Sequence, residues 1–220
     1  MKITDESPII VPVDNVLEAL DHGNKWTQGV WEGADGSMCL HQGIRVCQVQ
    51  AGDAFLIERV AERQGWGIDW NDEPGRSFDD IKSRLVEHRE VFPHELEETF
   101  GPQWAAVCGI VREAATLTPR QVSELSGAAA RDARAAQAAR AAGDAAWAAR
   151  DARAAQAARA AWAAGDAAGD AGAAWAARDA ARAVAVRHLI GQHGFTQEHY
   201  DTSVARWESV MGHKWTREAA

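Results

Sequence analysis

The stretch ARDARAAQAARAA occupies residues 130–142 and recurs, letter for letter, at residues 149–161. Both copies belong to a block, residues 128–183, that is built almost only of Ala, Arg, Asp, Gln, Gly and Trp. Alanine has the highest helix propensity, and Arg and Gln follow closely. The block can form helix without burying much surface, because an alanine side chain loses no rotamer freedom on ordering. Disorder is the alternative for low-complexity sequence, and we favour helix.

The residues other than alanine recur in this block about every 3.2 residues, short of the 3.6 residues of one helical turn. A straight helix would therefore present no constant buried face, and no seven-residue repeat suits a coiled coil. We expect shorter helices packed through their alanine faces, and a single exposed rod is the alternative. Breaks are expected at Gly143-Asp144 and Gly165-Asp166, where a C-cap residue directly precedes an N-cap residue. The three tryptophans of the block would fill gaps in this thin core: Trp147, Trp162 and Trp175.

The net charge of −9 is unevenly distributed along the 220 residues. Residues 1–127 hold 11 Lys and Arg against 22 Asp and Glu, whereas residues 128–220 hold 12 against 10. An acidic first half disfavours nucleic-acid binding, which needs clustered cations. No apolar run is long enough to span a membrane, and the N-terminus lacks the apolar core of a signal peptide. Three cysteines are too few for a disulfide framework, which fits a reducing cytosol.

Local signals outside the block predict a mainly α protein. SPIIVPV, residues 7–13, is typical of an extended edge strand or packed arm because of its prolines. Glu73-Pro74-Gly75-Arg76 predicts a type II turn, and Ser77 with Asp80 predicts a capping box. Helices are expected near residues 15–22 after Asp14 as cap, 39–47, 54–63 after Asp53 as cap, 77–88, 93–101, 103–115 and from Thr118 into the block.

The end of the chain predicts a final amphipathic helix. The helix that leaves the alanine block should end at Gly191 or Gly194. Thr196 then caps a helix over residues 197–211, in which Tyr200, Val204, Trp207 and Met211 share one face. Together with the charge distribution, these signals predict an acidic helical domain over residues 1–117 and an alanine-rich helical domain over residues 118–220.

Residues 15–90 resemble an uncharacterised domain family of actinobacteria and their phages. The matching features are Trp26-Thr27-Gln28-Gly29, Cys39 with Gly43, and Trp70-Asn71-Asp72-Glu73-Pro74-Gly75-Arg76. The alanine-rich block and the tail VRHLIGQHGFTQEHYD also look like modules attached to various phage proteins. The resemblance implies an actinobacteriophage or its host as the source and the cytoplasm as the setting. It implies no activity.

Catalytic and metal-binding chemistry are weakly indicated. Cys39, His41 and Cys47 are candidate metal ligands, but the second Cys/His pair usual for zinc is missing, and we expect no metal and no cofactor. Cys39 is also a candidate nucleophile, with His41 as base and Asp72 as orienting group, although nothing in the sequence places them together. No phosphate-binding glycine loop and no G-x-S-x-G motif occurs.

Binding to another protein is the function that the sequence favours, since aromatic residues are preferred at interfaces and the chain has ten tryptophans. The acidic domain would supply specificity, and the alanine-rich helices a scaffold or an oligomerisation surface. The candidate binding residues, for which a purely structural role is the stronger alternative, are Trp26, Gln28, Trp70, Asn71, Asp72 and Arg76. A host or defence protein is the expected partner of a phage accessory protein. The alternatives are a virion component, a cysteine-dependent enzyme and an acidic mimic of DNA.

Overall fold

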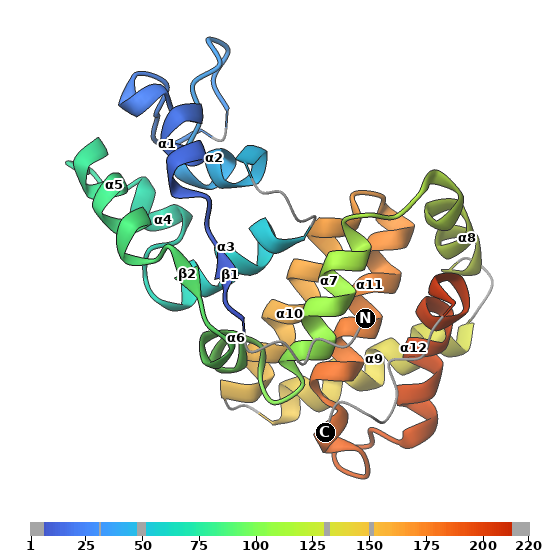
Figure 1. The fold of residues 1–220 in the computed structure, drawn as a ribbon. Coiled ribbons are helices and arrows are strands. Elements are labelled where there is room, and N and C mark those ends of the chain that lie inside the picture. Colours follow the sequence, from blue (N-terminus) through green and yellow to red (C-terminus); the bar gives the residue numbers. More distant parts are fainter. Residues whose placement is uncertain (1–6, 31, 48–51, 130–132, 150–151, 213–220) are drawn as a thin grey trace. The chain divides into compact units, whose positions relative to one another are not determined.

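The computed structural model describes residues 7–30, 32–47, 52–129, 133–149 and 152–212, and this part of the chain is mainly α (Figure 1). It contains helices α1 to α12 and two strands of two residues each, which confirms the predicted fold class. The chain divides into two compact units, Glu6–Glu95 and Leu96–Ala220. The division lies earlier than the position after residue 117 that composition suggested, because the helix over Trp104–Ala114 packs on the alanine-rich helices.

The acidic unit, Glu6–Glu95, consists of short helices and one small sheet. Strand β1 (Ile9–Ile10) pairs antiparallel with β2 (Glu90–Val91), as expected for an extended arm. Between the strands lie α1 (Val13–Ala19), the 3-10 turn η1 (Asp21–Gly23), α2 (Leu40–Cys47), α3 (Asp53–Arg63), α4 (Ile68–Asn71) and α5 (Phe78–Glu87). The helix α6 (Pro93–Phe100) spans the division between the two units.

Most of the local predictions for the acidic unit are confirmed. Ser77 and Asp80 form the capping box of α5. The Arg76 amide donates to the Glu73 carbonyl at 3.2 Å, and Gly75 has a φ of +86°, as a type II turn requires. The prediction of Asp14 and Asp53 as N-caps is wrong. Both lie inside the first helical turn, and the N-cap positions are Pro12 and Gly52 respectively.

The core of the acidic unit contains a tryptophan between two imidazoles. Trp66 is fully buried, and its ring stacks on His88 with centroids 4.8 Å apart and on His41 with centroids 6.3 Å apart. The same core contains fully buried aliphatic side chains, among them Leu20, Leu40, Ile44, Leu56, Ile57, Ile81 and Leu85.

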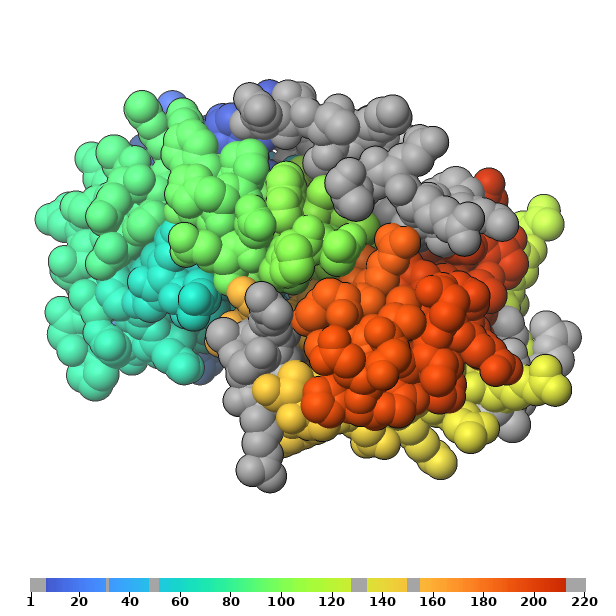
Figure 2. Space-filling model, turned by 90° about the horizontal axis from the view of Figure 1, so that it is seen from below, coloured from blue at the N-terminus to red at the C-terminus, as the bar shows by residue number. Residues whose placement is uncertain are grey.

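The alanine-rich unit, Leu96–Ala220, is arranged around one central helix. Its elements are α7 (Trp104–Ala114), α8 (Pro119–Ala129), α9 (Ala133–Ala148), α10 (Ala152–Ala168), α11 (Ala171–Ala185), η2 (Arg187–Leu189) and α12 (Gln197–Met211). Helix α11 contacts α7, α8, α9, α10 and α12. Helix α12 also packs on α9, so that the red surface of the last helix borders the yellow surface of α9 in Figure 2. The alanine-rich block is therefore a set of packed helices, and the rod is excluded.

The breaks in the block differ from those expected. Gly143-Asp144 lies inside α9 and Gly165-Asp166 lies inside α10. The described break falls at Gly169, which has a φ of +70°, followed by Asp170, whose carboxylate accepts hydrogen bonds from the amides of Gly172 and Ala173. A Gly-Asp pair does interrupt the block, but Gly143 and Gly165 stay helical, because tertiary packing offsets the roughly 1 kcal/mol that a glycine costs inside a helix.

The two copies of the repeated stretch bury the same face. Ala138 and Ala157 hold equivalent positions, as do Ala142 and Ala161, and all four are buried. Their neighbours differ, because α9 packs on α12 whereas α10 packs on α7. The two copies thus bury the same alanine face against different helices.

The terminal helix matches its sequence signal. Thr196 caps α12 together with His199, and Tyr200, Val204 and Trp207 are buried. The preceding helix is shorter than expected, since α11 ends at Ala185 and the chain passes through η2 before Gly191.

Candidate functional site

The three tryptophans of the alanine-rich block lie on the surface, which corrects their expected role in the core. The exposed fractions of Trp147, Trp162 and Trp175 are 81%, 56% and 59%. The reason is that alanines occupy the buried positions of α9, α10 and α11, so the helices approach too closely for an indole to fit between them. Tryptophan instead shares the outward positions with Arg, Asp and Gln. That sharing is visible in the sequence and would have identified these residues.

Two of these tryptophans line one cavity of about 570 Å³, which we name the tryptophan groove. Trp147 comes from α9 and Trp175 from α11. Small residues of α9 (Ala136, Ala139 and Gly143) and charged residues from three helices (Arg140, Asp144, Asp179, Arg182 and Arg206) complete its lining. The groove therefore combines exposed aromatic surface with charges of both signs.

Asp179 is the unusual charged group of the groove. Only 8% of this residue is exposed, and burial raises the pKa of its carboxyl to about 6, although Arg182 and Arg206 oppose the rise. Within the described part of the chain, no hydrogen bond or ion pair reaches the carboxylate. A buried carboxylate without a partner is costly, and such groups concentrate at sites that bind or react. Nothing in the alanine-rich sequence distinguished Asp179 from the other aspartates.

Trp162 extends the aromatic surface beyond the groove. The guanidinium carbon of Arg178 lies 4.6 Å from the centre of the Trp162 ring, and Arg178 Nη2 pairs with Asp166 Oδ1 at 3.4 Å. Arg178 follows Trp175 by three residues on α11, so both side chains lie on the same side of that helix. Through Arg178, Trp162 of α10 is thus connected to the side of α11 that carries Trp175.

The structure also brings together the residues singled out in the acidic unit. Trp26 Nε1 donates to Asn71 Oδ1 at 3.0 Å, and the Asn71 amide nitrogen donates to Asp72 Oδ1 at 2.7 Å. Gln28 Nε2 donates to the carbonyls of Asn71 and Glu73 at 2.7 and 3.0 Å. These contacts join the Trp-Thr-Gln-Gly segment to the Trp-Asn-Asp segment at the end of α4.

The remaining two residues of that set complete the same network. The guanidinium of Arg76 lies over the Trp70 ring at 4.1 Å, and its Nε donates to the Trp70 carbonyl at 3.3 Å. Arg76 also pairs with Glu73. Asn71 is fully buried and only 9% of Trp70 is exposed. The polar groups of this cluster are used within the chain, to hold two loops together.

Cys39 and its neighbours have the environment of core residues. Cys39 is 2% exposed, and burial raises the pKa of its thiol, the direction opposite to that of a nucleophilic cysteine. Burial lowers the pKa of His41 to about 4. The Cys47 thiol donates to the Asn15 carbonyl. No group of three or more His, Cys, Asp or Glu suited to a metal ion occurs among the described residues.

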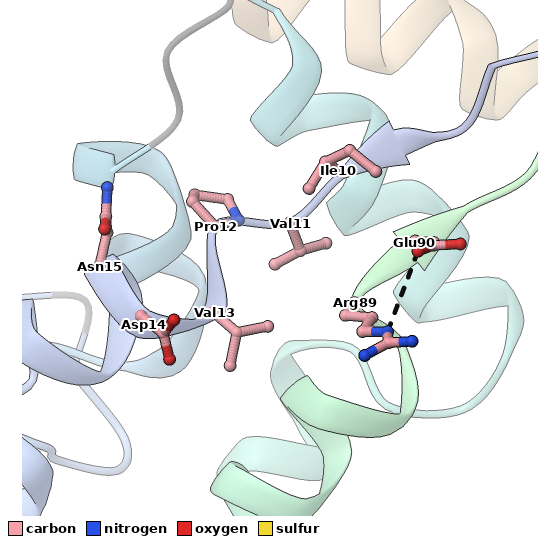
Figure 3. A pocket seen from close by; sticks show the side chains of 8 residues that line it. All are labelled: Ile10, Val11, Pro12, Val13, Asp14, Asn15, Arg89 and Glu90. Atoms are coloured by element: carbon pink, nitrogen blue, oxygen red, sulfur yellow. Dashed lines mark ion pairs between the residues drawn. The ribbon is translucent and has the colours of Figure 1, made fainter.

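A second cavity, of about 510 Å³, opens beside the small sheet of the acidic unit (Figure 3). It is lined by residues 10–15, Arg89 and Glu90. Two of its three charged residues are close to each other, with Arg89 Nε and Glu90 Oε1 3.9 Å apart, and the third is Asp14. This cavity lacks the buried charge and exposed indoles of the tryptophan groove, which is therefore the stronger candidate.

Comparison of the chain with protein-family models, with curated proteins and with solved structures gives no match in any of the three. None of the described helices combines the length and the apolar character needed to cross a membrane. The chemistry of the groove itself is consequently the basis for assigning a function.

Proposed function

We propose that this protein is a protein-binding module and that the tryptophan groove, with Trp162 beside it, is its contact surface. The observation that carries the proposal is the exposure of Trp147, Trp162 and Trp175 on adjoining helices. Burying an indole removes about 150–250 Å² from water, which favours association by roughly 4–6 kcal/mol before its entropic costs. Grouped exposed aromatics mark interaction sites, and tryptophan is enriched among interface hot spots.

The alanine helices support this proposal through their rigidity. Their buried faces approach closely, as at Gly172, where an added Cβ would lie 2.7 Å from Ser126 Cα. A surface held by such packing loses little conformational entropy on binding, which leaves more of the burial energy for affinity. The proposal thus moves the contact surface from the acidic unit, where the sequence suggested it, to the alanine-rich unit.

The partner is proposed to be a host or phage protein in the cytoplasm. This part of the proposal rests on the resemblance of residues 15–90 to domains of actinobacteria and their phages. The Cys39 environment gives no support to the alternative of a cysteine-dependent enzyme. A protein of a bacterial defence system is the first partner to test.

The test is capture of partners from an actinobacterial lysate by the tagged full-length chain. Three baits are compared: the wild type, a Trp147→Ala/Trp175→Ala variant, and a control with Val86→Ala/Phe92→Ala, which removes exposed apolar groups of the acidic unit. We expect one stoichiometric partner with the wild type and the control, and its loss with the groove variant. Absence of any stoichiometric partner, or equal capture by the groove variant, contradicts the proposal.

A further inference from the structure

Asp179 gives the tryptophan groove a chemical preference. Asp179 is only 8% exposed, lines the groove and has no hydrogen-bond or ion-pair partner among the described residues. Arg182 and Arg206 lie near enough to act on its charge but do not pair with it. A ligand that brings hydrogen-bond donors and a positive charge to this carboxylate would offset the cost of its burial.

The two indoles of the groove favour the same kind of ligand. The face of a tryptophan ring attracts a cation, most strongly where water is excluded. In the described part of the chain, no cation lies over the rings of Trp147 or Trp175. Trp175 precedes Asp179 by four residues on α11, so the ring and the carboxylate lie on the same side of the helix, one turn apart.

The same unit contains an internal example of this arrangement. At Trp162, Arg178 lies over the indole ring and pairs with the carboxylate of Asp166. The groove presents indoles and a carboxylate in the same way, but in the described part of the chain its own arginines neither lie over these rings nor pair with Asp179. We infer that the tryptophan groove binds an arginine side chain of the partner protein, with its guanidinium over Trp175 and paired with Asp179. This inference rests on the proposed protein-binding function.

Arginine suits the groove better than other ligands of similar size. Its planar guanidinium stacks on an aromatic ring and donates two parallel hydrogen bonds to a carboxylate, which a lysine ammonium does not. A nucleotide would find cations in Arg140, Arg182 and Arg206, but its phosphate would bring negative charge close to the unpaired Asp179. The three arginines instead suit acidic residues that flank the bound arginine, so the recognised segment carries both signs of charge.

The experiment is titration of the full-length protein with the peptide acetyl-Glu-Ala-Arg-Ala-Glu-amide. A second peptide carries citrulline in place of arginine and so keeps the shape but loses the positive charge. We expect the arginine peptide to bind at least about tenfold more tightly, by calorimetry, and to shift the indole N–H resonances of Trp147 and Trp175. Asp179→Asn should abolish the preference between the peptides, whereas Asp201→Asn, which changes a carboxylate on α12 outside the groove, should retain it.

The possible outcomes separate this inference from the proposed function. Equal binding of the two peptides, or tighter binding of adenosine monophosphate than of either, overturns the arginine site. The same conclusion follows if the groove variant Trp147→Ala/Trp175→Ala converts a dimer of this chain into a monomer, because the occupant is then a second copy. If the arginine preference fails while capture from the lysate still depends on both tryptophans, the proposed function stands without the arginine site.

Discussion

Trp175 and Asp179 are one turn apart on α11, yet 59% of the first residue is exposed and only 8% of the second. The helix therefore passes within one turn from open aromatic surface to a buried charge. Both residues line the same cavity, so a ligand that covers the indole also reaches the carboxylate. This change along a single helical face is the feature that separates the tryptophan groove from an ordinary exposed apolar patch.

Replacing the exposed tryptophans should leave the fold intact. Trp147→Ala should change the free energy of unfolding by less than about 0.5 kcal/mol, because 81% of this residue is exposed, and Trp175→Ala, with 59% exposed, by about 1–2 kcal/mol. Trp207→Ala should cost about 3–5 kcal/mol, since Trp207 is fully buried and donates to Glu113 at 3.1 Å. Urea unfolding followed by circular dichroism measures all three. If a groove variant is as unstable as Trp207→Ala, the replaced tryptophan is packed within the protein and is not available to a partner.

Asp179 should make the alanine-rich unit less stable as the pH rises. Its pKa is raised from 3.8 to about 6 in the folded state, so between these values the folded state keeps a proton that the unfolded state has released. Below pH 3.8 the protonation of Asp179 costs the folded state nothing. The free energy of unfolding then falls by at most about 3 kcal/mol as the pH rises past 6. The charges that line the groove with it are Arg140, Asp144, Arg182 and Arg206.

The measurement for Asp179 is the urea midpoint of the wild type relative to that of Asp179→Asn between pH 4 and 8. We expect the variant to gain on the wild type across this range, because it has no proton to lose. A constant difference between the two midpoints would show that the folded and unfolded pKa values are equal.

His41 should give the acidic unit the opposite dependence. Burial lowers the pKa of His41 from 6.5 to about 4, so between these values the unfolded state binds a proton that the folded state excludes. The acidic unit therefore loses at most about 3 kcal/mol of stability as the pH falls from 6.5 to 4. A titration of the imidazole Cε1–H resonance should have its midpoint near pH 4. A midpoint near 6.5 would mean that water reaches the face of the ring opposite Trp66.

Asn71 should be indispensable to the loop network of the acidic unit. Its Oδ1 accepts from Trp26 Nε1 and, at 3.4 Å, from the Leu40 amide. Asn71→Ala leaves both donors unpaired and should cost about 2–4 kcal/mol. Asn24→Ala, at an exposed turn, is the matched control and should stay within about 0.5 kcal/mol of the wild type. Equal urea midpoints for the two variants would refute this role.

Gly172 and Gly143 should respond oppositely to alanine. At Gly172 a Cβ would meet Ser126 Cα at 2.7 Å, so α8 and α11 would have to separate, at a cost of about 1–3 kcal/mol. At Gly143 the nearest atom is Arg182 Nη1 at 3.4 Å, an ordinary contact, and alanine should stabilise α9 by up to about 1 kcal/mol. Thermal unfolding of the two variants tests the pair, and a stabilised Gly172→Ala would contradict the close contact.

The local elements could be predicted because their causes are local. Thr196 caps α12 and Ser77 caps α5 through hydrogen bonds that close within three residues, so the sequence specifies them directly. The break in the alanine block could not be chosen in this way. Gly143-Asp144, Gly165-Asp166 and Gly169-Asp170 carry the same signal, and only packing against other helices decides which pair interrupts the chain.

The candidate site was missed for a related reason. Tryptophan is usually a core residue, so the sequence predicted Trp147, Trp162 and Trp175 to lie between the helices. In a core made of alanines, the backbones lie too close together for an indole, and the large side chains are displaced to the surface with the charged ones. Asp179 could be identified as a site residue only from the structure, since its burial depends on how α9 and α12 pack beside α11.

The repeated stretch leaves one problem that its alanines cannot solve. Methyl groups offer nearly the same profile at every turn, so α10 could slide along α11 by one turn and still find a similar surface. The alignment of α10 on α11 must then come from singular contacts, such as the pair of Arg178 with Asp166 at 3.4 Å and the Arg178 guanidinium 4.6 Å from the centre of the Trp162 ring. In this unit the abundant residue supplies cohesion and the rare ones supply position, so sequence drift should be tolerated among the former far more readily than among the latter.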